Sequence, residues 1–126
     1  MQRDDLVILA VDDDKINIML LKSVLKKTGI VKETITATNG EEAMEVLKTR
    51  DDVDLVLLDI IMPIMNGLEM LQVARADDNL RQVPIIVLTT DETKKEEALE
   101  LGANDFLMKP IRKDDLARKI KSIIIE

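Results

Sequence analysis

The residues of this chain that are best suited to chemistry each stand at the end of an apolar run. Asp12 and Asp13 follow the first run, and Asp59 follows a second one. Thr89 closes a third run, and Lys109 follows a fourth. Carboxylates that meet an ammonium and a hydroxyl can bind a hard cation and handle a phosphoryl group. The question is therefore whether the chain brings these five residues together.

Four of the apolar runs have the length and composition of buried strands. Continuous Val, Ile and Leu stretches are typical of a parallel sheet that is covered on both faces. The predicted strands are Leu6–Val11, Asp54–Leu58, Pro84–Thr89 and Asp105–Met108. A fifth stretch, Lys32–Thr36, alternates more and predicts an edge strand.

Helical patterns separate the strands. The predicted helices are Lys15–Lys27, Glu41–Lys48, Leu68–Ala76, Thr93–Leu101 and Asp114–Ile125. In the first of them the spacing of Ile16, Leu20 and Val24 predicts one apolar face, and Gly29 predicts its end. The fourth helix has a candidate capping box of Thr93 and Glu96.

Five repeats of strand and helix predict the fold. This alternation favours βαβ units and an α/β fold with one doubly wound, five-stranded parallel sheet. Right-handed crossovers leave few topologies, and the order 2-1-3-4-5 is the simplest. In such a sheet the ligand crevice lies at the carboxyl ends of the strands, beside strand 1. The five residues named above all stand at that edge. We expect residues 1–126 to form a single domain.

The composition limits which metals and which kinds of partner the chain can bind. The chain has no histidine and no cysteine, so a metal must be held by oxygen ligands, which favours Mg²⁺ or Ca²⁺. Its formal net charge of −7 argues against nucleic acid binding by this domain. No apolar run is long enough for a membrane span, and a cytoplasmic location is the expected default.

The carboxylates themselves predict a magnesium site. Two carboxylates about 4 Å apart repel each other by roughly 4 kcal/mol at an effective dielectric constant near 20. Such a cluster takes up protons or binds a cation, and Mg²⁺ accepts one or two carboxylates together with phosphate oxygens. Asp59 would then be the nucleophile, with Lys109 and Thr89 contacting the phosphoryl oxygens.

Each of these residues also has a simpler interpretation. The segment Asp12–Asp14 could only cap the next helix, Asp59 could be a turn residue, and Lys109 could be a solvated lysine. An enzymatic alternative is a phosphatase of the haloacid-dehalogenase type, whose DxDx(T/V) pattern Asp12, Asp14 and Ile16 approach.

Four segments of the chain resemble the receiver domain of two-component response regulators, which has the flavodoxin-like and CheY-like (βα)5 fold. The most specific is a DxxMPxMxG stretch that begins at Asp59. The resemblance covers essentially the whole chain, in order and spacing. The segments are Val11–Asp14, Leu58–Gly67, Val87–Thr90 and Gly102–Pro110.

The resemblance implies a role for each site residue. Asp59 matches the phosphorylated aspartate, and Thr89 and Lys109 match the residues that contact its phosphoryl group. Thr89 and Phe106 match the switch pair. Asp12, Asp13 and Asp59, together with the backbone carbonyl of Ile61, match the Mg²⁺ ligands. The bond before Pro110 is expected to be cis.

The resemblance also implies a function. The chain would be a phosphoacceptor switch rather than an enzyme, catalysing only its own phosphorylation and slow dephosphorylation. A sensor histidine kinase or a histidine phosphotransfer protein would phosphorylate Asp59, and the face formed by residues 93–101, 105–108 and 114–125 would shift toward an effector domain or target protein. A receiver-like interaction module that works without phosphorylation is the second alternative. A stand-alone receiver and a piece of a longer regulator both fit the sequence, as do a monomer and a homodimer.

Overall fold

The computed structural model describes residues 5–60, 62 and 65–124. Its strands are β1 (Leu6–Val11), β2 (Val31–Ala37), β3 (Leu55–Asp59), β4 (Ile85–Thr89) and β5 (Asp105–Met108). All strand pairs are parallel, and their order is β2-β1-β3-β4-β5. The predicted α/β fold and its topology are therefore confirmed.

Among the described residues, four helices and one 3-10 turn connect the strands, and a fifth helix follows β5. They are α1 (Lys15–Thr28), α2 (Gly40–Thr49), α3 (Gly67–Ala76), the turn η1 (Glu92–Lys94), α4 (Lys95–Glu100) and α5 (Lys113–Ile124). None of these helices is long and apolar enough to cross a membrane, within the part of the chain that the structure describes.

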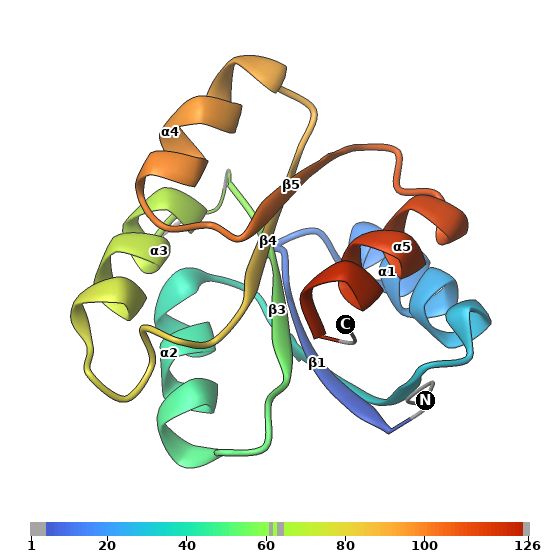
Figure 1. The fold of residues 1–126 in the computed structure, drawn as a ribbon, viewed down its shortest axis with the longest axis horizontal. Helices are drawn as coiled ribbons and strands as arrows, with labels where there is room; N and C mark the ends of the chain where they lie inside the picture. Colours follow the sequence, from blue (N-terminus) through green and yellow to red (C-terminus); the bar gives the residue numbers. More distant parts are fainter. Residues whose placement is uncertain (1–4, 61, 63–64, 125–126) are drawn as a thin grey trace.

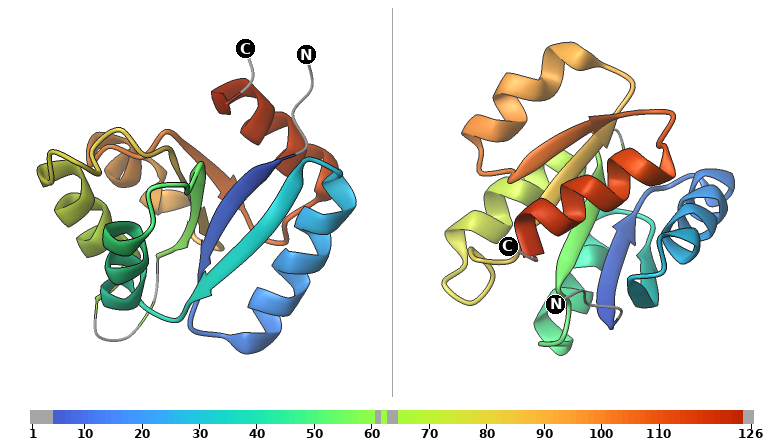
Figure 2. Two further views of the ribbon diagram at one scale, coloured as in Figure 1. Left: turned by 90° about the horizontal axis from the view of Figure 1, so that it is seen from below. Right: turned by 45° about the vertical axis from the view of Figure 1, so that its right-hand side comes forward.

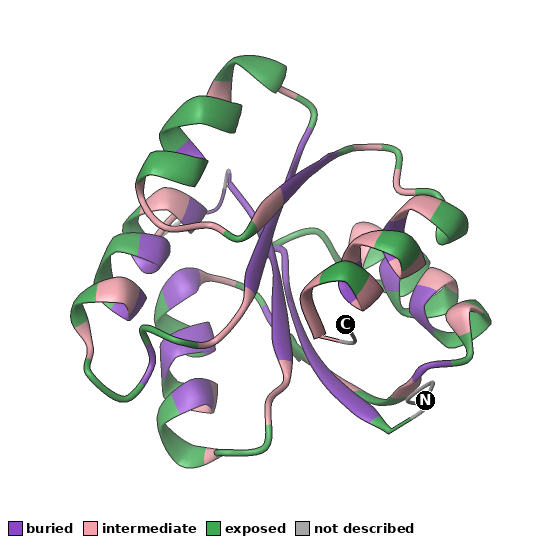
Figure 3. Cartoon of the chain, in the orientation of Figure 1, coloured by how far each residue is buried: buried purple, intermediate pink, exposed green. Residues whose placement is uncertain are grey.

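The helices form a layer on each side of the sheet. Helices α2, α3 and α4 lie on one side, and α1 and α5 lie on the other (Figures 1 and 2). Each layer encloses its own core cluster, because successive strand side chains point to opposite faces. Figure 3 shows buried strands at the centre and exposed surfaces on the outer sides of the helices.

The apolar face of α1 differs from the prediction. Ile16 and Leu20 are 67% and 61% exposed, whereas Leu21 and Leu25 are buried against the sheet. Ile18, Leu21 and Leu25 are also spaced as a helical stripe, at i, i+3 and i+7. The sequence of α1 thus contains two apolar stripes, and spacing alone could not decide which of them the sheet would cover.

The start of the fourth helical segment also differs. The capping box expected from Thr93 and Glu96 is wrong, because Asp91 is the capping residue and its Oδ1 accepts from the backbone N–H of Thr93 at 3.0 Å. The segment opens one residue before Thr93 with the 3-10 turn, so Thr93 already lies inside it. The end signal expected for α1 is confirmed: Gly29 follows the helix with a positive φ angle, and Gly102 follows α4 in the same way.

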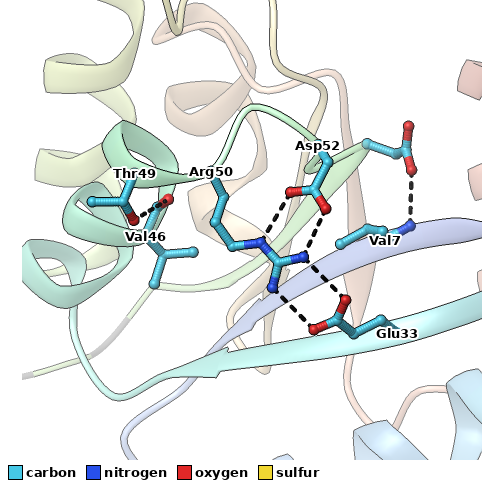
Figure 4. A network of polar contacts seen from close by, with 7 residues as sticks. Val7, Glu33, Val46, Thr49, Arg50 and Asp52 are labelled. Atoms are coloured by element: carbon cyan, nitrogen blue, oxygen red, sulfur yellow. Dashed lines mark hydrogen bonds and ion pairs between the residues drawn. The ribbon is translucent and has the colours of Figure 1, made fainter.

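The amino ends of the strands are joined by a charged network. The guanidinium of Arg50, just after α2, donates to both carboxylate oxygens of Glu33 on the edge strand β2, each at 3.0 Å (Figure 4). The same guanidinium donates to Asp52 at 3.0 and 2.7 Å. Such paired hydrogen bonds give the contact a fixed geometry, which ties α2 to the edge of the sheet. The candidate site lies at the opposite, carboxyl edge.

Gly67, the first residue of α3, lies directly against the end of β3. A Cβ atom added at Gly67 would come within 2.3 Å of the backbone oxygen of Asp59 and 2.8 Å of the Cα of Ile60. Backbone atoms cannot move aside as a side chain can. The absence of a side chain at Gly67 therefore lets α3 begin next to Asp59.

We expect Gly67→Ala to lower the free energy of unfolding by about 3 kcal/mol, the upper end of the usual cost of overpacking. Gly29→Ala is the control, because its added Cβ would contact nothing within 4 Å and only the positive φ of 74° would be strained. That strain should cost about 1 kcal/mol. Urea denaturation of both variants measures the difference, and equal losses would contradict the role given to Gly67.

Candidate functional site

The register of the sheet brings two of the acidic residues together. Val11 on β1 pairs with Leu58 on β3, so the next residues, Asp12 and Asp59, stand side by side at the carboxyl edge. Both are buried, at 5% and 8% exposure. Asp12 is held in place from two sides: its N–H donates to Ala37 O at 3.0 Å, and its Oδ1 accepts from Asp14 N at 3.0 Å.

Lys109 reaches the same point from β5. Its backbone N–H donates to Thr89 O at 2.8 Å, which continues the β4–β5 pairing. Its Nζ lies 3.0 Å from Asp59 Oδ1 and 3.2 Å from Asp12 Oδ2. The Lys109–Pro110 peptide bond is cis. The chain thus places one ammonium between two buried carboxylates that lie far apart in the sequence.

Asp13 completes an acidic cluster. One carboxylate oxygen each from Asp12, Asp13 and Asp59 lie within 4.8 Å of one another. Asp13 is exposed, whereas the other two are buried, so the cluster is open to solvent on the Asp13 side. Hard oxygen donors that are partly open to water fit Mg²⁺, which keeps several waters and takes few protein carboxylates. The donor set therefore fits this ion.

The electrostatics of the cluster are unbalanced. Burial raises the pKa of Asp59 above its ordinary value, the charge of Asp12 adds to this, and the hydrogen bond from Lys109 only partly opposes it. Burial alone would lower the pKa of Lys109, but its contacts with Asp59 and Asp12 outweigh burial and raise it. Three carboxylates against one ammonium leave a surplus of negative charge, and a divalent cation would remove that surplus.

This imbalance predicts a pH dependence of stability. The pKa of Asp59 is higher in the native state than in the unfolded chain. The contribution of Asp59 to stability therefore falls as the pH rises through its native-state pKa. With EDTA present, we expect the stability of Asp59→Asn relative to the unmodified chain to increase as pH rises from about 4 to about 7. Urea denaturation at a series of pH values measures this, and two parallel pH profiles would contradict it.

Thr89 and Phe106 lie on the neighbouring strands. Thr89 is 2% exposed at the end of β4, and its Oγ1 accepts from Asp91 N at 3.1 Å. Phe106 on β5 pairs with Val87 in register and is buried in the cluster beneath α3 and α4. In this structure the Thr89 hydroxyl is thus bonded to the loop that leads to η1.

The other acidic candidate has a structural role. Asp14 is the N-cap of α1, and its Oδ1 accepts from Ile16 N at 2.8 Å and from Asn17 N at 3.4 Å. Because Asp14 caps the helix and the side chain of Ile16 is largely exposed, the arrangement does not support the DxDx(T/V) phosphatase interpretation. Ile61, the expected carbonyl ligand, lies outside the described residues.

One further residue, Gly67, lies against the site. No role was expected for Gly67. The motif that begins at Asp59 includes this glycine eight residues later, so the sequence did contain a signal for it.

A groove of about 620 Å³ lies at the opposite edge of the sheet, with Arg50, Asp51 and Asp77 in its lining. None of the clustered carboxylates lines it, so it is separate from the candidate site.

Comparisons with known proteins agree with this geometry. The model of the response regulator receiver domain matches residues 8–121. The transcriptional regulatory protein CpxR of Escherichia coli is 40% identical over 119 residues, which are 93% of this chain and 48% of CpxR. The chemotaxis protein CheY1 of Helicobacter pylori is 33% identical over 119 residues, 93% of this chain and 95% of CheY1. The chain thus spans about half the length of CpxR and nearly all of CheY1.

Solved structures show the same fold. The receiver domain of the sensor histidine kinase PA1611 from Pseudomonas aeruginosa superposes with a TM-score of 0.86 at 28% identity, covering 96% of this chain and 98% of that one. That crystal structure has a magnesium ion coordinated in its active-site cleft.

Proposed function

This chain belongs to the response regulator receiver domain family, and on that basis we propose that it is a phosphoacceptor switch of a two-component or phosphorelay system. Asp59 accepts a phosphoryl group from a sensor histidine kinase or a histidine phosphotransfer protein. The observation that carries the proposal is the geometry at Asp59: a buried carboxylate, 3.0 Å from the ammonium of Lys109 and clustered with Asp12 and Asp13.

The proposed reaction is a direct displacement at phosphorus. A carboxylate oxygen of Asp59 bonds to phosphorus while the phosphorus–nitrogen bond of the donor phosphohistidine breaks. The nitrogen keeps the electron pair and takes up a proton from solvent. Lys109 stays beside the acceptor and donates to a phosphoryl oxygen, where negative charge gathers during transfer.

The same carboxylates would hold the cofactor. Asp12, Asp13 and Asp59 supply oxygen ligands to Mg²⁺, and we propose the carbonyl of Ile61 as a further ligand. When bound, the ion would supply positive charge that offsets the charge of the phosphoryl oxygens and of the cluster itself. Without the ion, the carboxylates would face an incoming anion with Lys109 as the one adjacent cation among the described residues, which would disfavour transfer.

Phosphorylation would then shift the output face. In the proposal Thr89 turns its hydroxyl from Asp91 to the phosphoryl group, and Phe106 follows it inward. This changes the face formed by α4, β5 and α5, to which an effector domain or target protein binds. A shift from mostly inactive to mostly active requires a free-energy difference of about 5 kcal/mol between the two states.

The proposal covers residues 1–126 as one receiver domain in the cytoplasm, with or without homodimerisation. The chain takes part in a transfer reaction and slowly hydrolyses its own acyl phosphate, but it turns over no separate substrate. A phosphorylation-independent interaction module needs none of the carboxylates at the site, so the cluster and its ammonium favour phosphorylation.

Small-molecule phosphorylation with and without magnesium tests the proposal. With acetyl phosphate and Mg²⁺, we expect the intact mass to show about one phosphoryl group per chain, because the acceptor is one carboxylate. With EDTA in place of Mg²⁺, the labelling rate should fall by about 100-fold or more, the size expected when a charge-stabilising group is lost. Equal labelling in EDTA would contradict the role of the ion, and no labelling in either case would contradict the proposed function.

A further inference from the structure

The segment between β4 and β5 is held very differently at its two ends. At the carboxyl end, Asn104 joins three parts of the molecule. Its side-chain Oδ1 accepts from Ile85 N at 2.9 Å and from Arg75 Nη2 at 3.0 Å, and its backbone N–H donates to Ile85 O at 2.8 Å. The turn that follows α4 is thereby bonded to the start of β4 and to α3.

Arg75 is the centre of this attachment. Its guanidinium donates from α3 to Gly102 O at 2.9 Å and Arg81 O at 3.0 Å, in addition to Asn104. Within the described residues its hydrogen-bond acceptors are all neutral, so Arg75 has no ion-pair partner there, and burial lowers its pKa. A guanidinium presents its donors in one rigid plane, so these contacts fix directions as well as distances.

Gly102 leaves room for the side chain of Arg75 because it has no side chain of its own. Its φ of 110° suits glycine, and an added Cβ would lie 2.7 Å from Arg75 Cγ. The stem of Arg75 therefore packs directly on the turn that ends α4. We call Arg75, Gly102 and Asn104 the α4 clamp.

The amino end of the segment has no such attachment. Asp91 N donates to Thr89 Oγ1 at 3.1 Å, and the remaining hydrogen bonds of Asp91 go to Thr93 and Lys94. No side chain caps α4 at its start, at Lys94. Within the described residues, no hydrogen bond or ion pair joins residues 92–97 to another helix or to a strand. Apart from the chain itself, the hydrogen bond to the Thr89 hydroxyl is thus the nearest polar contact between this end and the sheet among the described residues.

We propose that the α4 clamp is the pivot of the switch, so that rotation of Thr89 displaces η1 and the start of α4 while the end of α4 stays fixed. Arg75 is a positioning residue here, since it contacts none of the reacting groups. The proposal rests on phosphorylation of Asp59. It assigns the moving end of the output face to residues 92–97 and the fixed end to residues 100–104.

Spin labels measure the two ends separately. The chain has no cysteine, so two introduced cysteines are the only labelling sites. One pair joins exposed positions Glu92 and Glu45 on η1 and α2, and the other joins exposed Glu100 and the same Glu45. Distances are measured by pulsed electron resonance with Mg²⁺, before and after beryllofluoride is added as the phosphoryl mimic.

In the otherwise unmodified chain, we expect the Glu92–Glu45 distance to shift by about 2 Å and the Glu100–Glu45 distance to stay constant. In Arg75→Gln, both distances should shift. Arg81→Gln is the control, because Arg81 is exposed and, among the described residues, its side chain forms an ion pair only with Asp78 on the surface. Equal shifts at both ends of the unmodified chain, or a fixed Glu100 in Arg75→Gln, would overturn the pivot.

A second pair of variants covers the case in which Arg75→Gln does not fold. Asn104→Asp retains the acceptor oxygen of the clamp and should keep Glu100 fixed, whereas Asn104→Ala removes it and should release Glu100. Identical behaviour of these two variants would also overturn the pivot. Labelling of Asp59 by acetyl phosphate is measured in parallel, so failure of the proposed phosphorylation is distinguished from failure of the pivot alone.

Discussion

Asp59→Asn is expected to abolish labelling by acetyl phosphate, from about one phosphoryl group per chain to none, because the amide lacks the nucleophilic oxygen of the carboxylate. The substitution keeps the size of the side chain. It also removes one charge from a crowded acidic cluster, in which the buried Asp59 stands beside Asp12. The variant should therefore fold, and loss of the label would report on chemistry rather than on unfolding.

Asp12→Asn distinguishes phosphorylation of Asp59 from the phosphatase interpretation. The phosphatase interpretation makes Asp12 the nucleophile, so this variant rather than Asp59→Asn would then lose the label. An interaction module without phosphorylation would give no label in the unmodified chain. Full labelling of Asp59→Asn would contradict Asp59 as the phosphoryl acceptor.

The second large effect concerns magnesium. Asp13→Asn should weaken Mg²⁺ binding by about 10- to 100-fold or more. Substitution of residues that only hydrogen-bond to metal ligands already lowers metal affinity by that amount. Asp13 is the exposed member of the cluster, so its replacement disturbs little else in the fold. Because the chain has no tryptophan or tyrosine, titration calorimetry is the suitable measurement.

The neighbouring residue provides a matched control. Asp14→Asn makes the same chemical change one position along, and asparagine is as good an N-cap as aspartate. Asp14 bonds to the start of α1 and does not belong to the cluster. Its variant should bind Mg²⁺ almost as the unmodified chain does. If the two variants lost equal affinity for Mg²⁺, the loss would come from the lower negative charge of the chain, and Asp13 would not be a ligand.

The strands could be predicted because a parallel sheet covered on both faces demands apolar runs, and their order because right-handed crossovers leave few topologies. The run at Leu6–Val11 is apolar at every position, which suits a strand that is buried on both faces. The burial of α1 was not predictable in the same way. Ile16 and Leu21 are both large and apolar, and only the position of the sheet and of α5 decides which stripe is covered.

The sequence predicted which residues form the candidate site but not how their side chains contact one another. Parallel strands bring their carboxyl ends to one edge, which is why Asp12 and Asp59 meet. That Lys109 lies between them, and that the Thr89 hydroxyl bonds to Asp91, depends on side-chain conformations that residue spacing does not determine. Nothing in the sequence distinguishes Arg75 from any other arginine at the end of a helix, since its acceptors are carbonyl and amide oxygens that only the fold brings near.

The most direct test of phosphorylation at Asp59 is to trap the product chemically. Borohydride reduces an aspartyl phosphate to homoserine, and peptide mass mapping then locates the changed residue. After reaction with acetyl phosphate and Mg²⁺, we predict homoserine at position 59 and intact aspartate at positions 12, 13 and 14. Homoserine at any of those three positions, with Asp59 unchanged, would contradict the account.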